Sequence, residues 1–166
     1  MMTTDNIQEL EQICKDALAA YRGARKELAA VVNKPEDSDS MQELIASTEE
    51  LGLNATLHRL KTDDVKVAQA LTRLSEAAHH LGHTVNARED ARIRNNPKHQ
   101  RVYVEDGREF TLDIEKGIWT YLDDPQNPIQ VTVKRETKLP YDLLGFNGPE
   151  IDPPKPSKKK KMQPRM

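Results

Sequence analysis

The side chains best suited to metal chemistry lie in the stretch Glu76-Ala-Ala-His79-His80-Leu-Gly-His83. On a helix, Glu76, His79 and His83 share one face, because they follow each other at spacings of three and four residues. Carboxylate and imidazole groups at this spacing bind divalent ions, but a bundle site needs further ligands from a facing helix. The predicted facing helix offers no matching His or Glu cluster. We therefore predict a solvated polar face with no metal and no cofactor, and a metal-dependent enzyme at these residues is the least favoured hypothesis.

Other catalytic patterns are weak. The acidic pairs Glu49-Glu50, Asp63-Asp64 and Asp123-Asp124 consist of neighbours that point in different directions on a helix, and two of them lie where caps and turns favour Asp. The sequence contains no G-x-S-x-G elbow, no P-loop and no G-x-G-x-x-G. The single cysteine, Cys14, falls in an apolar helical stripe and is predicted to be a small core residue. The sequence predicts a protein that is not an enzyme, with no catalytic residues.

Positive charge is concentrated at the C-terminus, in a segment here called the basic arm (residues 153–166). It contains no acid and six basic residues, which are Lys155, Lys158, Lys159, Lys160, Lys161 and Arg165. The whole chain has 25 Lys and Arg against 27 Asp and Glu. Removing the six basic residues and Asp152 leaves 19 against 26, a net charge of −7 for residues 1–151. An acidic body repels nucleic acid, so contact with it requires the arm or a local basic surface.

Four consecutive lysines remain solvated until they meet an anionic partner. Neutralising about five phosphates would release counterions and give salt-dependent binding without base specificity. No aromatic residue interrupts the lysines, so base stacking is not expected, and the flanking prolines keep the arm extended. Three interpretations remain open: nonspecific contact with nucleic acid, a targeting or protein-binding signal, and a solubilising tail.

A second basic run begins before Pro97. It comprises Arg88, Arg92, Arg94, Lys98, His99 and Arg101. Arg88 and Arg92 are one helical turn apart, which predicts a continuous patch able to contact phosphates or acidic proteins. This Arg88–Arg101 patch, with Arg94, supports an alternative hypothesis of a nucleic-acid-binding regulator. Arginine stems that cover apolar surface and pair with neighbouring acids are an equally weighted interpretation.

Two long stretches have apolar residues at alternating spacings of three and four. A helix from Asp5 to about Asn33 carries Ile7, Leu10, Cys14, Ala17, Tyr21, Ala24, Leu28 and Val31. A helix from Thr62 to about Asn95 carries Val67, Leu71, Leu74, Ala78, Leu81 and Val85. Between them, a capping box at Ser40 and Glu43 predicts a short helix that ends at Gly52, and residues 54–60 are ambiguous.

The two stripes have the coiled-coil pattern that keeps one face against a partner helix. They predict an antiparallel helical hairpin or bundle over residues 1–96, although the same stripes can pair between chains. Interface candidates are Ile7, Leu10, Tyr21, Leu28, Leu71, Leu74 and Leu81.

After Pro97 the apolar spacing changes to two. Residues 101–114 predict a hairpin with its turn at Asp106-Gly107, followed by strands at 118–122 and 129–136. We expect a four-stranded antiparallel meander over 97–144 that packs on the helices, with Trp119 as the anchor of the sheet core. A strap should pack through Leu139, Tyr141, Leu143, Leu144 and Phe146, and residues 145–166 are assigned to a flexible arm rich in Pro and Lys.

The fold class predicted is therefore α+β. Hydrophobic residues make up 36% of the chain and aromatic residues 4%, and a core this lean often requires a protein partner or a homo-oligomer. No signal-peptide pattern occurs at the start and no stretch approaches the roughly 18 apolar residues of a membrane span. We expect a cytoplasmic or virion-associated protein, or a nuclear one in a eukaryote, without a membrane partner. The leading hypothesis is a non-enzymatic interaction or assembly protein of a larger complex or nucleoprotein particle, whose arm contacts nucleic acid or another anionic surface.

Overall fold

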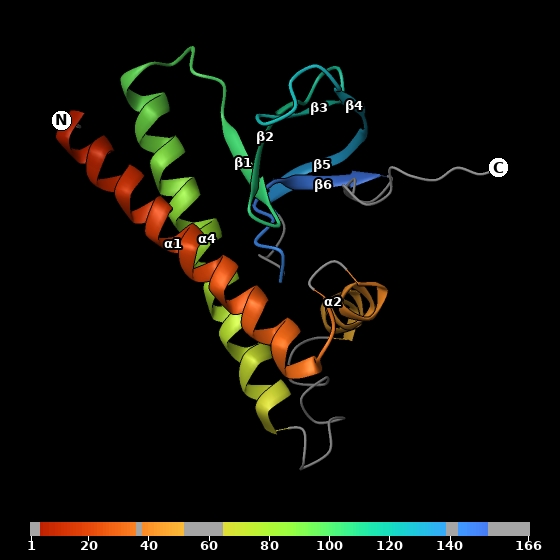
Figure 1. Cartoon of the computed structure of the whole chain (residues 1–166). Coiled ribbons are helices and arrows are strands. Elements are labelled where there is room, and N and C mark those ends of the chain that lie inside the picture. The colour runs from red at the N-terminus through yellow and green to blue at the C-terminus, as the bar shows by residue number, and fades with distance from the viewer. Residues whose placement is uncertain (1–3, 36–37, 52–64, 139–142, 153–166) are drawn as a thin grey trace.

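The computed structural model describes residues 4–35, 38–51, 65–138 and 143–152. Figure 1 shows two long helices side by side, running in opposite directions, with the strands gathered to one side of them. The fold is α+β, as predicted. The elements in chain order are α1 (Thr4–Val32), α2 (Asp39–Leu51), α4 (Val65–Asn95), β1 (Val102–Glu105), β2 (Arg108–Asp113), β3 (Ile118–Tyr121), β4 (Ile129–Gln130), β5 (Thr132–Lys138) and β6 (Pro149–Asp152).

The apolar stripes of α1 and α4 pack against each other within one chain. Five of the seven interface candidates have at most 1% of their surface exposed, namely Tyr21, Leu28, Leu71, Leu74 and Leu81, whereas Ile7 and Leu10 are half-buried. An ion pair from Arg92 to Glu11 joins the two helices near one end, and another from Arg73 to Glu27 joins them near the other. The predicted antiparallel hairpin is confirmed. No helix in the described ranges is both long and apolar enough to cross a membrane.

The short helix α2 begins earlier than its sequence signal indicated. Ser38 is the capping residue, because its Oγ accepts a hydrogen bond from the Met41 backbone N–H at 3.2 Å and its carbonyl accepts one from the Gln42 N–H at 3.1 Å. The capping box predicted at Ser40 is therefore wrong in register. The predicted stop at Gly52, the ambiguous segment 54–60 and the predicted helix start at 62–64 lie outside the described residues.

The first sheet is antiparallel in the order β1-β2-β3-β4. Its first turn lies at Asp106-Gly107, where φ is +56° and +76°, as a tight two-residue hairpin turn requires. Trp119 is fully buried and stacks on Phe110 with ring centroids 3.7 Å apart. The predicted turn and the role of Trp119 as the anchor of the sheet core are both confirmed.

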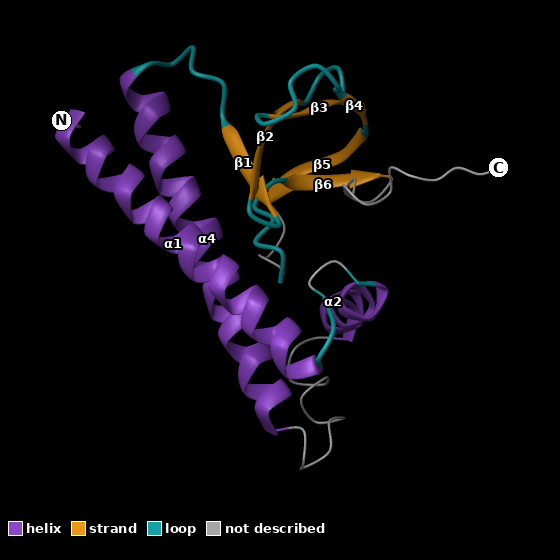
Figure 2. Cartoon of the chain, viewed as in Figure 1, coloured by secondary structure: helices purple, strands orange, loops and turns teal. Residues whose placement is uncertain are grey.

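The predicted fourth strand, 129–136, is divided into two. β4 ends at Gln130, and β5 pairs with β6 in a separate two-stranded sheet (Figure 2). The division falls at Val131, whose side chain is 3% exposed and whose backbone N–H donates to the Gly117 carbonyl at 2.8 Å. The single-strand prediction is wrong because alternation continues through Val131 and gives no sign of the bend.

The predicted flexible arm starts too early at residue 145. Phe146 is 1% exposed and packs against Trp119, with ring centroids 5.9 Å apart, and β6 extends to Asp152. Leu143 and Leu144 also pack in the core, so this part of the predicted strap is confirmed. Leu139, Tyr141 and the basic arm lie outside the described residues.

Gly117 is required by the bend between the two sheets. Its φ is +68°, and a Cβ placed on it would lie 2.1 Å from the Val131 carbonyl oxygen. We expect Gly117→Ala to lower the free energy of unfolding by about 1–3 kcal/mol, because the residue is left strained at positive φ against a fixed backbone. Urea denaturation measures this loss.

Gly23 provides the matched control. It lies in the middle of α1, and a Cβ there would meet no atom within 4 Å. Gly23→Ala is expected to raise the free energy of unfolding by about 0.5–1 kcal/mol, because alanine loses less backbone entropy in a helix. Effects of the same sign at the two glycines would contradict the assigned role of Gly117.

Candidate functional site at the junction of helices and sheet

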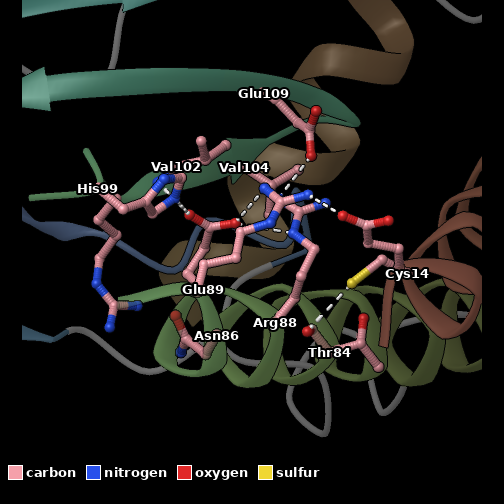
Figure 3. Close-up of polar contacts among 12 residues, drawn as sticks. Cys14, Thr84, Asn86, Arg88, Glu89, His99, Val102, Val104 and Glu109 are labelled. Atoms are coloured by element: carbon pink, nitrogen blue, oxygen red, sulfur yellow. Dashed lines mark hydrogen bonds and ion pairs between the residues drawn. The ribbon is translucent and has the colours of Figure 1, made fainter. Parts of the chain in front are cut away.

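A buried carboxylate, Glu89, connects the C-terminal part of α4 to the start of β1. Its side chain is 0% exposed and accepts hydrogen bonds from Arg88 Nε at 2.8 Å, Arg92 Nη1 at 2.8 Å and the Val102 backbone N–H at 2.9 Å. Both arginines bond Glu89 Oε2, whereas Oε1, the oxygen that accepts from Val102, also lies 2.7 Å from His99 Nε2 (Figure 3). Glu89 thereby fixes the position of the first strand relative to the helix.

The surroundings of Glu89 keep it ionised. Burial by itself would raise the pKa of this carboxyl group, but the hydrogen bonds from His99 and the Val102 N–H, together with the Arg88 guanidinium, hold the pKa below its ordinary value. Arg88 is itself 7% exposed and also pairs with Glu109 through Nη2 at 2.8 Å. The junction therefore contains a buried ion pair whose charges compensate each other. Removing either partner strongly destabilises the folded chain.

The outer edge of β1 is closed by groups from outside the first sheet. The Val102 N–H bonds Glu89, the Val104 N–H bonds Asn147 Oδ1 at 3.0 Å, and the Asp106 N–H bonds the Leu144 carbonyl at 2.7 Å. Asn147 is 0% exposed and also donates through Nδ2 to Asn86 Oδ1 of α4 at 3.0 Å. Every second N–H along this edge, from Val102 to Asp106, thus has a partner. These N–H groups are therefore not available to pair with an added strand.

The turn between β1 and β2 is attached to α1. Tyr21 Oη donates to Asp106 Oδ1 at 2.9 Å, and Arg25 Nε pairs with the same oxygen at 3.3 Å. A Cβ placed on Gly107 would lie 3.4 Å from the Leu18 side chain and 3.7 Å from the Tyr21 ring. With Glu89 and Asn147, this attachment joins the helical hairpin and the first sheet at both ends of β1.

A cavity of about 340 Å³ lies between α1, α4 and the β1–β2 hairpin. Its apolar lining is formed by Cys14, Leu18, Leu81, Val85 and Val104, and its charged lining by Glu11, Lys15, Arg88, Arg92 and Glu109. This volume falls within the range of small-molecule pockets. Three basic and two acidic side chains line it, and Glu89 lies behind two of the arginines. With Glu89 included, three basic and three acidic side chains surround the cavity, so their formal charges balance.

Cys14 belongs to this lining but is not an activated nucleophile. Its Sγ donates to the Thr84 carbonyl at 3.2 Å, and its residue surface is 4% exposed. Burial raises the pKa of the Cys14 thiol, which keeps it protonated at neutral pH. The prediction of a small core residue is confirmed.

The predicted Arg88–Arg101 patch is largely occupied by ion pairs. Arg88 and Arg92 are paired with the acids described above, and Arg101 pairs with Asp90. Arg94 and Lys98 are exposed at the end of α4 and just beyond it. The structure thus places the patch partly in the interior, and contact between Arg94 and nucleic acid stays a prediction. The arm candidates lie outside the described residues; these are Lys158, Lys159, Lys160, Lys161 and Arg165.

The three clustered histidines, His79, His80 and His83, are exposed on α4, as its heptad register predicted, and Glu76 is exposed one turn earlier. The rings of His79 and His83 have centroids 6.5 Å apart. Within the described ranges, no three or more His, Cys, Asp or Glu side chains are placed together to hold a metal ion.

Sequence reasoning missed Glu89 and Asn147, the two buried polar residues that organise the junction. A signal for Glu89 was present, because it lies four residues after the buried Val85 and therefore on the core side of the helix. Asn147 lies in Gly145-Phe-Asn-Gly148, which has no periodicity to indicate burial.

Comparisons with known proteins were made for the whole chain. No family model, no curated protein and no solved structure matches it.

Proposed function

We propose that this chain is a non-enzymatic interaction or assembly protein whose folded body carries a basic arm that contacts nucleic acid or a similar polyanion. The body supplies a helical hairpin joined to a sheet, and the arm follows directly after β6, which ends at Asp152. In this proposal the arm supplies affinity through phosphate contacts, and the body fixes the arm within a larger complex.

The separation of charge between body and arm carries this proposal. In the alternative hypothesis, arginines of the Arg88–Arg101 patch contact phosphates. Arg88 and Arg92 instead form ion pairs with acids of the body, and both pair with Glu89. The arm has six basic residues and no acid in its sequence. Five of the seven interface candidates are buried between the two helices of the same chain. We therefore propose that partners bind through the arm and not through the apolar stripes of the helices.

A truncation after Asp152 tests the proposal. It removes residues 153–166 and keeps the pairing of Asp152 with Thr132 in the second sheet. Binding to duplex DNA and to single-stranded RNA is measured by fluorescence anisotropy over a salt series. We expect the full chain to bind, with log affinity falling against log salt at a slope of about −4.5 for five phosphate contacts on duplex DNA, and the truncated chain to show no binding.

Two variants serve as controls. Replacing Lys158, Lys159, Lys160 and Lys161 with glutamine keeps the length of the arm and should reduce both the affinity and the salt slope. Replacing the exposed Arg94 and Lys98 with glutamate should leave binding that depends on the arm largely intact, since neither residue belongs to the arm. If the truncated chain binds as well as the full chain, the folded patch is the site. If neither chain binds, nucleic-acid contact is excluded and the proposal fails.

A further inference from the structure

The cavity between α1, α4 and the β1–β2 hairpin has an apolar interior and a charged mouth. Four of its lining residues are at most 4% exposed and offer mainly apolar surface; these are Cys14, Leu81, Val85 and Val104. Most of the charged lining is more exposed, since the side chains of Arg92 and Glu109 are 27% and 36% exposed and Lys15 is exposed. A molecule inside the cavity is therefore bounded mainly by apolar atoms and meets most of the charged groups near the mouth.

The charged groups around this cavity already compensate one another. Arg88 pairs with Glu89 and Glu109. Arg92 also pairs with Glu89, and its second ion pair is with Glu11. Over the whole lining with Glu89, the formal charges balance. An ionised ligand would lose its hydration on entering without gaining a counter-ion, which is costly, whereas an uncharged ligand avoids this cost.

The walls of the cavity are held in place before any ligand enters. The ion pair from Arg92 to Glu11 joins α4 to α1, and the ion pair from Arg88 to Glu109 joins α4 to β2. Figure 3 shows four of the lining residues, one from each of α1, α4, β1 and β2, on facing elements; these are Cys14, Arg88, Val104 and Glu109. A site that is formed in advance loses less entropy when it binds.

The volume of the cavity, about 340 Å³, limits the size of the ligand. A dry apolar cavity of about 150 Å³ binds benzene. A cavity roughly twice as large therefore has room for two fused rings or for an aliphatic skeleton of similar size. The guanidinium and ammonium groups of the lining only donate hydrogen bonds, so a hydroxyl or carbonyl oxygen on the ligand can accept one there.

We propose that this cavity is a binding site for a small uncharged molecule, with an apolar skeleton of about two rings and a single hydroxyl or carbonyl group. The apolar interior supplies the affinity, and the balanced charges of the lining exclude ionised molecules of the same shape. The lining residues belong to the two long helices and to the β1–β2 hairpin. The site is therefore independent of the proposed function of the arm.

Calorimetric titration of the full chain at neutral pH tests the site with 2-naphthol, which has two fused rings, one hydroxyl group and no charge. Two ligands with the same rings carry opposite charges, namely 2-naphthoate and 2-naphthylmethylammonium. We expect saturable binding of one 2-naphthol per chain, and binding of both charged ligands that is at least about tenfold weaker, because each would bring an unpaired charge into the cavity. If 2-naphthol does not bind, or if a charged ligand binds as tightly, the proposal is wrong.

Leu18→Phe places the binding in the cavity. Leu18 is a half-buried lining residue, and a larger side chain there takes up part of the volume. We expect the affinity for 2-naphthol to fall at least about tenfold, as for other overpacked apolar sites. Ile13→Phe is the matched control, because Ile13 lies on the same helix, is 42% exposed and is not part of the lining. Unchanged affinity in Leu18→Phe, or an equal loss in Ile13→Phe, would overturn the assignment.

A measurement on the wild type makes the test independent of how well any variant folds. In protein with labelled methyl groups, nuclear Overhauser effects should connect the ring protons of 2-naphthol to the methyl groups of the lining; these belong to Leu18, Leu81, Val85 and Val104. Leu122, which follows β3 and is 47% exposed, should show none. Contacts to Leu122 without contacts to the lining would mean adventitious surface binding only, and the proposed site would be rejected.

Discussion

Replacing Glu89 with alanine is expected to lower the free energy of unfolding by about 3–5 kcal/mol, because the change leaves a buried cationic partner without the acceptor of its Nε. The partner is Arg88, which is 7% exposed and has its Nε 2.8 Å from Glu89. The Val102 N–H also loses its acceptor at the edge of β1. Urea denaturation of the wild type and of Glu89→Ala measures the loss. The free energies are extrapolated with each protein's own dependence on urea concentration.

Glu109→Ala is the matched control for this prediction. Glu109 pairs with the same arginine at 2.8 Å, but its side chain is 36% exposed. Water can solvate the Nη2 side of Arg88 after this change, so the loss should be about 1 kcal/mol or less. If Glu89→Ala were no more destabilising than Glu109→Ala, the carboxylate would not be the attachment between helix and strand that its contacts indicate.

The same carboxylate predicts an acid-sensitive part of the stability. The pKa of Glu89 is lower in the folded chain than its ordinary value, so the unfolded chain takes up this proton more readily as the pH falls. The stability contributed by the ionised group is therefore present above about pH 5, and it is lost as the pH falls through about 4.3 and then through the lower folded pKa. Glu89→Gln cannot lose stability in this way, because an amide takes up no proton in this pH range. The difference in unfolding free energy between the wild type and Glu89→Gln should narrow from pH 6 to pH 3.

The helical hairpin could be predicted because its signal is local and repeated. The spacing of three and four residues in the first helix and again in the third assigns each residue to a face without knowledge of the partner. Tyr21 and Leu71 both followed from this pattern, and both are buried. The first β-hairpin followed in the same way from a period of two and from the chemistry of Asp106-Gly107.

The junction could not be predicted because its partners are distant in sequence. Glu89 lies within the charged run Asn86-Ala-Arg-Glu-Asp-Ala-Arg-Ile-Arg94, and such composition favours exposure. Its burial is tolerable only because Arg88, His99 and the Val102 N–H converge on it, and that convergence depends on where the strand returns to the helix. For the same reason the sequence left two interpretations of Arg88 open, and its burial and its pairs with Glu89 and Glu109 favour the ion-pair interpretation.

The second sheet shows a different limit of sequence reasoning. Alternation runs from Ile129 through Val133 without interruption, yet the chain bends at Val131. The bend is fixed by the hydrogen bond from Val131 to the Gly117 carbonyl and by pairing with β6, which lies in a segment assigned to the arm. The sequence of β5 does not show that β6 is its partner, because β6 follows a segment without periodicity.

Replacing Asn147 with leucine is expected to lower the free energy of unfolding by roughly 2–4 kcal/mol, because each buried polar group that loses its partner costs about 1–3 kcal/mol. The groups affected are the Val104 N–H, which loses its acceptor at 3.0 Å, and Asn86, which loses the amide donor of Asn147. Leucine has a similar size, so the loss reports hydrogen bonding rather than an empty cavity. Urea denaturation at neutral pH measures it.

Asn127→Leu separates this effect from a general effect of exchanging asparagine for leucine. Asn127 is exposed, and its amide donates to Asp124 within the same loop. This change should alter the free energy of unfolding by about 0.5 kcal/mol or less, as for most surface substitutions. Hydrogen exchange at the Val104 amide adds a local readout: its protection should fall in Asn147→Leu and remain unchanged in Asn127→Leu. If Val104 stayed as protected in Asn147→Leu as in the wild type, another group would be closing the edge of β1, and the assigned role of Asn147 would be wrong.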